Sequence, residues 1–270
     1  MCQGLLVVVK GGGDMATGVA HRLYRVGMRV AITELPRPTV IRRPVAFASA
    51  GWLGEITVEG VSARLADNPV QALALLEAGI IPALVDPEAR VVREWQPDVV
   101  VDAIIAKRNL GTCITDAPIV IALGPGFTAS VDCHAVVETQ RGHFLGRVIT
   151  EGQAAPNTGI PGAVQGYTDE RVIRALCAGT FRGERRIGDR VEAGQMVARV
   201  DGEPVVARIS GVLRGLLADG LLVHAGMKVG DVDPRGVIEH CFTISDKARA
   251  VGGGVLEAIL WLHRQREMTK

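Results

Sequence analysis

The first apolar run of the chain is short and continuous. Residues 5–9 are all hydrophobic and include three valines, a pattern typical of a strand buried on both faces. Three glycines follow, and apolar residues then recur at helical spacing from Ala16 to Val26, with polar residues on the opposite side. Gly27 stands where a glycine commonly ends a helix. The pattern predicts a strand, a glycine turn and a helix, which is the opening of a nucleotide-binding βαβ unit.

Apolar strands and helices continue to alternate through the first half of the chain. We predict strands at 28–33, 81–85, 98–106 and 118–123, a hairpin over 55–65, and a helix from Pro69 to Ala78. This alternation is the pattern of a parallel α/β sheet. The sequence therefore predicts a Rossmann-like α/β domain over residues 1–166.

The turn after the first strand fits the dinucleotide-binding fingerprint in a relaxed form. Its predicted binding residues are Gly11, Gly12, Gly13, Asp14, Ala16, Thr17 and Glu34. Glu34 follows Gly13 by 21 residues, where an acid accepts hydrogen bonds from a ribose. The helix start attracts phosphate. However, the Asp14 carboxylate can cap the helix and compete with phosphate for the same donors. A turn kept for its shape, without a nucleotide, is therefore the alternative.

Polar clusters follow the later strands as well. The predicted binding residues there are Lys107, Arg108, Asn109, Gly124, Gly126, His134 and Arg141. Because parallel strands gather their carboxyl ends at one edge, these loops are expected to meet the glycine turn and form an anion-binding cleft. The alternative is a set of solvated loops, with Lys107 in a salt bridge to Asp102 or Asp116. A basic segment with Arg37, Arg42 and Arg43 either contacts phosphates or is an exposed connector.

The sequence predicts neither a metal site nor a catalytic nucleophile. Cys133 and His134 are adjacent, so on a strand they point to opposite faces. No second cysteine stands at ligand spacing. The chain also lacks the serine elbow of hydrolases and the P-loop lysine motif.

An internal repeat marks a second domain, predicted over residues 175–237. Residues 187–200 match residues 219–232 after a shift of 32, with glycines and valines at equivalent positions. Such a duplicated strand–turn–strand unit can close into a small flattened barrel. It looks like the biotinyl/lipoyl hammerhead fold, in which a lysine at a hairpin tip carries the cofactor. The corresponding tip, residues 200–205, has no lysine, so cofactor attachment is ruled out and a scaffold or docking module remains.

The last part of the chain, residues 240–264, is predicted to pack back on the first domain. A short strand at 240–244 leads to a helix capped by Ser245 or Asp246 and running to about His263. Gly252, Gly253 and Gly254 are costly inside a helix. Either they allow close packing, or they interrupt the helix and form a second ligand turn.

Composition narrows the classes of function. The chain is 48% hydrophobic and only 4% aromatic, and 30 basic residues oppose 29 acidic ones, so charge does not favour bulk nucleic-acid or membrane binding. There is no apolar stretch of about 18 residues and no signal core, so we expect a cytoplasmic protein. Five scattered cysteines predict reduced, mostly buried thiols.

Several long blocks of the chain resemble the YqeB family. They are VVKGGGDMATGVAHRLYRVG, ITELPRPTVIRRPVAFA, DAIIAKRNLGTCITDAPIVIALGPGFTA, HAVVETQRGHFLGRVI, NTGIPG and ISDKARAVGGGVLEAIL. That family is the accessory protein linked to selenium-dependent molybdenum hydroxylases. The first domain also looks like the Rossmann part of the XdhC/CoxI proteins, which help insert sulfurated molybdenum cofactor into xanthine dehydrogenase-type enzymes.

The resemblance implies a maturation factor that binds a nucleotide or a molybdopterin-type anion and helps prepare or deliver a molybdenum cofactor. The implied ligands are NAD(P) or a molybdopterin nucleotide, and the implied partner is a client molybdenum hydroxylase, with a homo-oligomer also allowed. Direct selenium handling does not follow, because no cysteine sits in an evident selenium-transfer motif. The alternative is an NAD(P)-dependent oxidoreductase of a small metabolite, with His134 or Lys107 as its acid or base.

Overall fold

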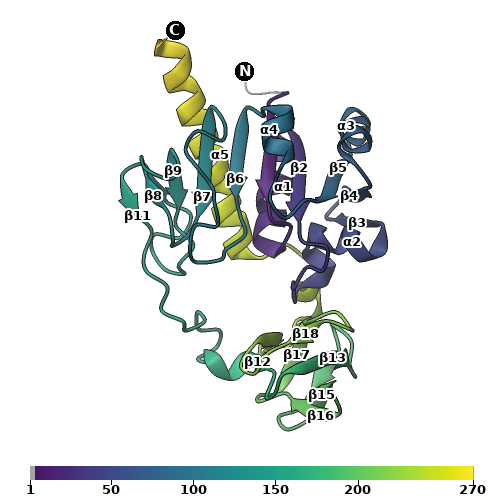
Figure 1. Ribbon diagram of the computed structural model, residues 1–270. Helices are drawn as coiled ribbons and strands as arrows, with labels where there is room; N and C mark the ends of the chain where they lie inside the picture. The colour runs from purple at the N-terminus through teal and green to yellow at the C-terminus, as the bar shows by residue number, and fades with distance from the viewer. Residues whose placement is uncertain (1–3, 270) are drawn as a thin grey trace. The chain divides into compact units, whose positions relative to one another are not determined.

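The computed structural model describes residues 4–269 and divides into two compact units (Figure 1). Unit 1 contains the chain up to Pro38, then Ala46–Thr158, and then the chain from Ile244 onward. Unit 2 contains Thr39–Val45 and Gly159–Thr243. Unit 2 is thus inserted into unit 1, and the last helix belongs to unit 1.

Unit 1 is a mixed α/β structure built on a nine-stranded sheet. Its strands are β1 (Leu6–Lys10), β2 (Arg29–Glu34), β3 (Glu55–Val58), β4 (Val61–Ala66), β5 (Ile81–Val85), β6 (Val99–Asp102), β7 (Ile119–Leu123), β9 (Ala135–Val137) and β10 (Val148–Ile149). Two short strands, β8 (Thr128–Ala129) and β11 (Gly152–Gln153), pair separately. The helical elements are α1 (Asp14–Arg25), η2 (Phe47–Ser49), α2 (Ala50–Leu53), α3 (Pro69–Glu77), α4 (Val91–Trp95) and α5 (Asp246–Thr269). The prediction of an α/β class with a large, mostly parallel sheet and a C-terminal helix is confirmed.

The strand order of the large sheet is β10-β9-β7-β6-β1-β2-β5-β4-β3. All neighbouring pairs from β9 to β4 are parallel, and the outer pairs β10–β9 and β4–β3 are antiparallel. The chain leaves β1 for β2 on one side and later returns to β6 on the other side. The carboxyl ends of β1 and β6 therefore flank a topological switch point, where open α/β sheets bind ligands.

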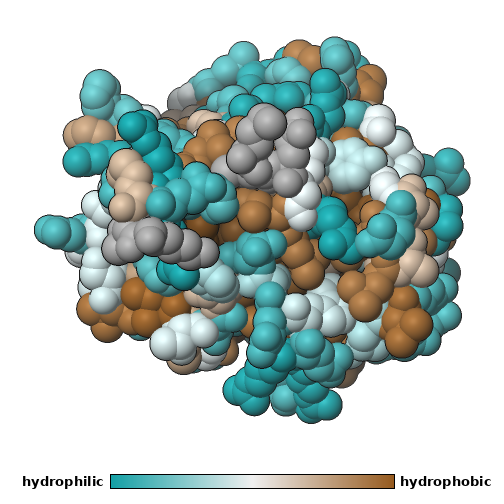
Figure 2. All heavy atoms as spheres, turned by 90° about the horizontal axis from the view of Figure 1, so that it is seen from above, coloured by the Kyte–Doolittle hydropathy of each residue, from teal (hydrophilic) through white to brown (hydrophobic). Residues whose placement is uncertain are grey.

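Two pairs of helices pack on the sheet. Leu75 of α3 and Val91 of α4 share a buried cluster with Val8, Val100 and Val120 of the central strands. Helix α5 packs along α1 and reaches β7, β9 and β10. Hydrophobic and hydrophilic residues are interspersed on the surface seen from above (Figure 2). Among the described residues, no helix combines the length and apolar character needed to span a membrane.

The three consecutive glycines of the tail lie inside the continuous helix α5 and do not interrupt it. A Cβ on Gly252 would lie 2.8 Å from the Gly18 carbonyl oxygen of α1, and a Cβ on Gly254 would collide with the Gly146 carbonyl oxygen. Gly253 has nothing within 4 Å. Close packing is therefore the reason for two of the three glycines.

Unit 2 consists of two four-stranded sheets that repeat one arrangement. Their orders are β16-β15-β13-β18 and β12-β19-β17-β14. The strands are β12 (Val172–Arg174), β13 (Gly179–Gly183), β14 (Arg190–Val191), β15 (Met196–Val200), β16 (Glu203–Val206), β17 (Gly211–Leu216), β18 (Leu222–Val223) and β19 (Lys228–Asp233). The shift of 32 residues carries β14 onto β18 and β15 onto β19. Because β13 pairs with β18 and β17 pairs with β14, each repeat lends a short strand to the sheet of the other.

Two arginines bind the first segment of unit 2, residues 39–45, to later parts of the same unit. Arg42 donates to the carbonyls of His240 and Thr243, at 2.9 and 3.0 Å, and Arg43 donates to the Leu216 carbonyl at 2.8 Å. Residues 39–45, assigned to the first domain from the sequence, therefore pack in unit 2. The predicted strand at 240–244 is wrong: η4 (Ile238–Cys241) is a 3₁₀ helix whose carbonyls are partly satisfied by arginine. Unit 2 also contains η1 (Arg43–Val45) and η3 (Asp169–Arg171).

Candidate functional site

The glycine turn between β1 and α1 is packed against the protein's own backbone. Gly11 has φ +91°, and a Cβ there would lie 3.2 Å from the Ala103 carbonyl oxygen. A Cβ on Gly12 would lie 2.8 Å from the Ala48 nitrogen, which donates to the Gly12 carbonyl. These two glycines therefore accommodate neighbouring backbone segments. Their predicted contact with a ligand stays a prediction.

Glu34, at the end of β2, is bound to that turn. Its Oε2 accepts the Gly12 N–H at 2.8 Å, and its Oε1 accepts the Leu35 N–H at 2.8 Å. Burial raises the pKa of Glu34, although both backbone N–H groups act in the opposite direction. To bind a ribose, as predicted, the carboxylate has to share or exchange its bond to Gly12.

The raised pKa of Glu34 makes a testable contribution to stability. A group whose pKa is raised on folding stabilises the native state at low pH, and that contribution is lost as the pH rises from the ordinary carboxyl value through the folded one. We expect the unfolding free energy of the wild type, relative to Glu34→Gln, to fall as the pH rises above the ordinary carboxyl value of 4.5. Urea denaturation at several pH values measures this difference. A difference that stays constant or grows with pH contradicts it.

The start of α1 is held by buried side chains. Gly13 is the N-cap, and its carbonyl accepts the Thr17 N–H at 2.8 Å. The Thr17 hydroxyl donates to the Gly12 carbonyl and accepts the Phe47 N–H at 2.9 Å. Ala16 is buried against the sheet, and Asp14 is the first residue of the helix. The roles seen for Ala16 and Thr17 are thus in packing and in fixing the turn.

The loop after β6 has a strained backbone. Ile105 and Lys107 have φ values of +60° and +62°, in the left-handed region that a β-branched residue such as Ile105 rarely adopts. Gly126 packs so closely under this loop that a Cβ would lie 2.5 Å from the Arg108 nitrogen. The Asn109 side chain accepts the N–H groups of Gly111 and Thr112 and therefore organises its own loop. Strain of this kind persists only where packing enforces it, and it clusters at functional sites.

A buried polar network lies beneath this loop, and we did not predict it from the sequence. Lys10 ends β1 and donates from Nζ to the Thr112 hydroxyl at 2.5 Å, and that hydroxyl donates to Asp102 at 2.6 Å. Lys10 and Asp102 are 7% and 2% exposed. Lys107 forms no ion pair with Asp102, Asp116 or any other described residue, so the salt bridge predicted for Lys107 is wrong. The wider alternative of solvated loops stays a prediction. The sequence signal that could have revealed this network is a charged residue at the end of each of two apolar strands, Lys10 and Asp102.

The loops after β7 and β9 lie at the carboxyl edge of the large sheet, as the glycine turn does. Gly124 has φ +73° and lies against the side chain of Thr139. Arg141 binds Asp246, at the start of α5, through two hydrogen bonds of 2.7 and 2.8 Å. The structure therefore brings together the glycine turn, the 107–109 loop, Gly124, Gly126 and Arg141, as expected from parallel strands.

His134 does not belong to this cluster. It precedes β9, which runs parallel to β7, and its Nδ1 accepts the N–H of Val120 near the start of β7, at 3.0 Å. It therefore lies toward the amino-terminal edge of the sheet. Burial, with the charge of Arg266, lowers the pKa of its ring. No group of three or more metal-binding side chains is placed to hold an ion within residues 4–269.

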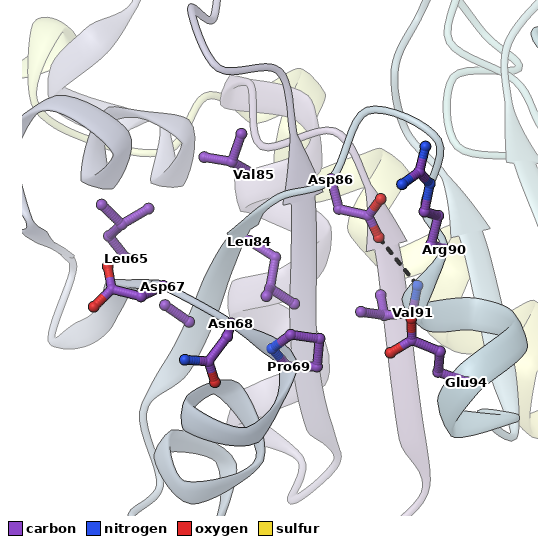
Figure 3. A pocket seen from close by; sticks show the side chains of 11 residues that line it. Leu65, Asp67, Asn68, Pro69, Leu84, Val85, Asp86, Arg90, Val91 and Glu94 are labelled. Carbon is purple, nitrogen blue, oxygen red and sulfur yellow. Dashed lines mark hydrogen bonds between the residues drawn. The ribbon is translucent and has the colours of Figure 1, made fainter.

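A separate pocket of about 370 Å³ opens beside the carboxyl ends of β4 and β5 (Figure 3). Its charged lining is Asp67, Asp86, Glu94 and Arg90, and Asp86 accepts the Val91 N–H at 3.0 Å. None of the predicted binding residues lines it. Three carboxylates against one guanidinium make it unfavourable for an anion.

The described cysteines are free thiols, and Cys2 lies outside the described residues. Cys133 and Cys241 are buried, Cys177 is half-buried and Cys113 is exposed. Burial raises the pKa of Cys133 to about 12, which makes this thiol a poor nucleophile.

Together these features define a class of protein: an α/β protein with a glycine-lined switch point in its large sheet and an inserted unit built mainly of β-strands. The chain belongs to the YqeB family. It is 54% identical over 260 residues to the uncharacterized protein YqeB of Escherichia coli K12, a match that covers 96% of this chain and 48% of that protein. The chain thus spans about half the length of this curated relative.

Other comparisons add little. No protein-family model matches the chain. Among solved structures, the ectoine utilization protein EutE (DoeB) of Ruegeria pomeroyi matches at 12% identity and a TM-score of 0.26, covering 85% of both chains. An aspartoacylase family protein of Mesorhizobium loti matches at 13% identity and a TM-score of 0.27, covering 85% of this chain and 84% of that one. Similarity at this level carries no argument about function.

Proposed function

We propose that this protein is an accessory factor for the maturation of a molybdenum hydroxylase, and that it binds a nucleotide or molybdopterin-type anion at the carboxyl edge of the large sheet. The observation that carries the proposal is the strained loop after β6, which presents Lys107 and Arg108 at the switch point. Membership in the YqeB family, and the resemblance of the first domain to Rossmann domains of the XdhC/CoxI proteins, support the pathway. A client hydroxylase is the proposed partner, and selenium is proposed only as a property of that client.

Unit 2 is proposed to be a hammerhead-like scaffold or docking module. Its two interlocked sheets, related by the 32-residue repeat, support this assignment. The β15–β16 tip at Asp201 and Gly202 offers no lysine for lipoyl or biotinyl attachment.

A cellular experiment tests the proposed function. In cells that lack this protein, the client molybdenum hydroxylase is expected to accumulate without full activity and with less bound molybdopterin, measured on the purified hydroxylase. Restoring the wild-type gene is expected to restore both. Full activity and normal cofactor content in the deletion strain would overturn the proposal.

The alternative of an NAD(P)-dependent oxidoreductase has less support. A hydride enzyme needs an acid or base beside the nicotinamide, and of the two predicted candidates only Lys107 lies near the glycine turn. His134 is separated from it by the length of the strands. Steady-state turnover of NAD(P)H with a panel of metabolites distinguishes the two functions.

A further inference from the structure

Lysine is rare in this chain and gathers at one place. Of 30 basic residues only five are lysines, and four of these lie in the described part of the chain. Three of the four are at the carboxyl edge of unit 1: Lys10 ends β1, Lys107 follows β6, and Lys247 lies in the first turn of α5. Lysine is a compact charge on a flexible stem and a common phosphate ligand.

Lys247 is fixed near the start of α1 by helix packing. Ala248, the next residue, lies so close to Gly18 that a Cβ on Gly18 would be 2.7 Å from the Ala248 Cβ. The charges of Asp14, Glu138, Arg141 and Lys107 all act on the Lys247 ammonium, so three other segments of unit 1 bring charged groups near it.

Lys247 is half-buried and has no polar partner among the described residues, and Lys107 has none either. Two charged side chains near Lys247 already have other partners. Arg141 is bound by Asp246, and the Glu138 carboxylate accepts the N–H groups of Gln140 and Ala155, each at 2.7 Å. Burial is the main reason that the pKa of Lys247 is lowered, which means that its charged form is poorly solvated. A desolvated ammonium without a hydrogen bond is costly unless it has a ligand to bind.

We propose that Lys247 and Lys107 together bind the phosphate group of a phosphate ester or diphosphate at this edge. This rests on the proposed function, which places an anionic ligand there. The proposal adds helix α5 to the site, because Lys247 lies in this helix, which follows unit 2 along the chain. The N–H groups at the start of α1 point toward the same edge and are proposed as further donors to the phosphate.

Calorimetric titration of the full chain with pyrophosphate and with ADP tests the proposal. The wild type is expected to bind, and Lys247→Met to bind about tenfold or more weakly, as for the loss of a charge-assisted hydrogen bond. Lys247→Arg is expected to retain part of the affinity. The matched control is Arg264→Met, which removes an exposed charge from the other end of α5 and is expected to bind like the wild type.

Thermal unfolding without a probe separates binding from a structural role. Because Lys247→Met removes a poorly solvated charge, its unfolding temperature is expected to equal or exceed that of the wild type. A lower unfolding temperature together with unchanged affinity would overturn the inference and leave the proposed function standing. A wild type that binds neither probe would overturn a phosphate site at this edge, whereas the hydroxylase experiment tests the maturation role independently.

Discussion

Gly254→Ala is expected to lower the unfolding free energy by about 2 kcal/mol or more, whereas Gly253→Ala, one residue away, is expected to raise it by about 0.5–1 kcal/mol. In α5 both positions are helical, so alanine gains the same helix propensity at each. At Gly254, however, the added methyl collides with the Gly146 carbonyl and approaches Val137 Cγ1 to 2.9 Å. The carbonyl belongs to the backbone, and the β-branched Val137 side chain has little freedom to turn away, so the backbone has to move.

Chemical denaturation of both single variants measures this contrast. Gly253→Ala is the matched control, because it makes the same substitution in the same helix at a position with open space. Equal effects of the two variants would show that α5 does not pack on the 138–147 loop as described. Gly252→Ala, which faces Gly18 of α1, is expected to behave like Gly254→Ala.

Lys10→Met is expected to lower the unfolding free energy by about 3–5 kcal/mol, because it leaves the Asp102 charge buried without its partner. Nearly all of the Asp102 side chain is inaccessible, and its remaining bonds come from the Thr112 hydroxyl and the Ile104 N–H. Asp102→Asn in the Lys10→Met background removes that charge and is expected to recover most of the loss. A double-mutant cycle measured by urea denaturation gives the coupling energy.

An exposed ion pair provides the control for Lys10. Arg64 and Glu55 pair across β3 and β4 at 2.8 Å, with side chains 44% and 43% exposed. Arg64→Met is expected to change the unfolding free energy by about 1 kcal/mol or less. If Lys10→Met has no larger effect than Arg64→Met, the buried network does not support the strained loop above it.

Local sequence patterns determined most of the elements of this protein. The apolar run of β1, the hairpin of β3 and β4, and the Asn68 cap with Pro69 at the start of α3 were all predictable from the sequence, because each depends on residues only a few positions apart. The 32-residue repeat likewise reappears as equivalent strands in unit 2. The gathering of the loops was also predictable, because parallel strands place their carboxyl ends at the same edge of a sheet.

Tertiary structure decided which groups the residues of the candidate site contact. Gly12 is set against the backbone of Ala48, and Glu34 is bound to Gly12 rather than left open. Lys10 and Thr112 are 102 residues apart in the chain, and Lys247 arrives only after the inserted unit 2. The physical reason is range: periodicity and turn chemistry act over a few residues, whereas the partner and the solvation of a charge depend on segments that only the complete fold brings together.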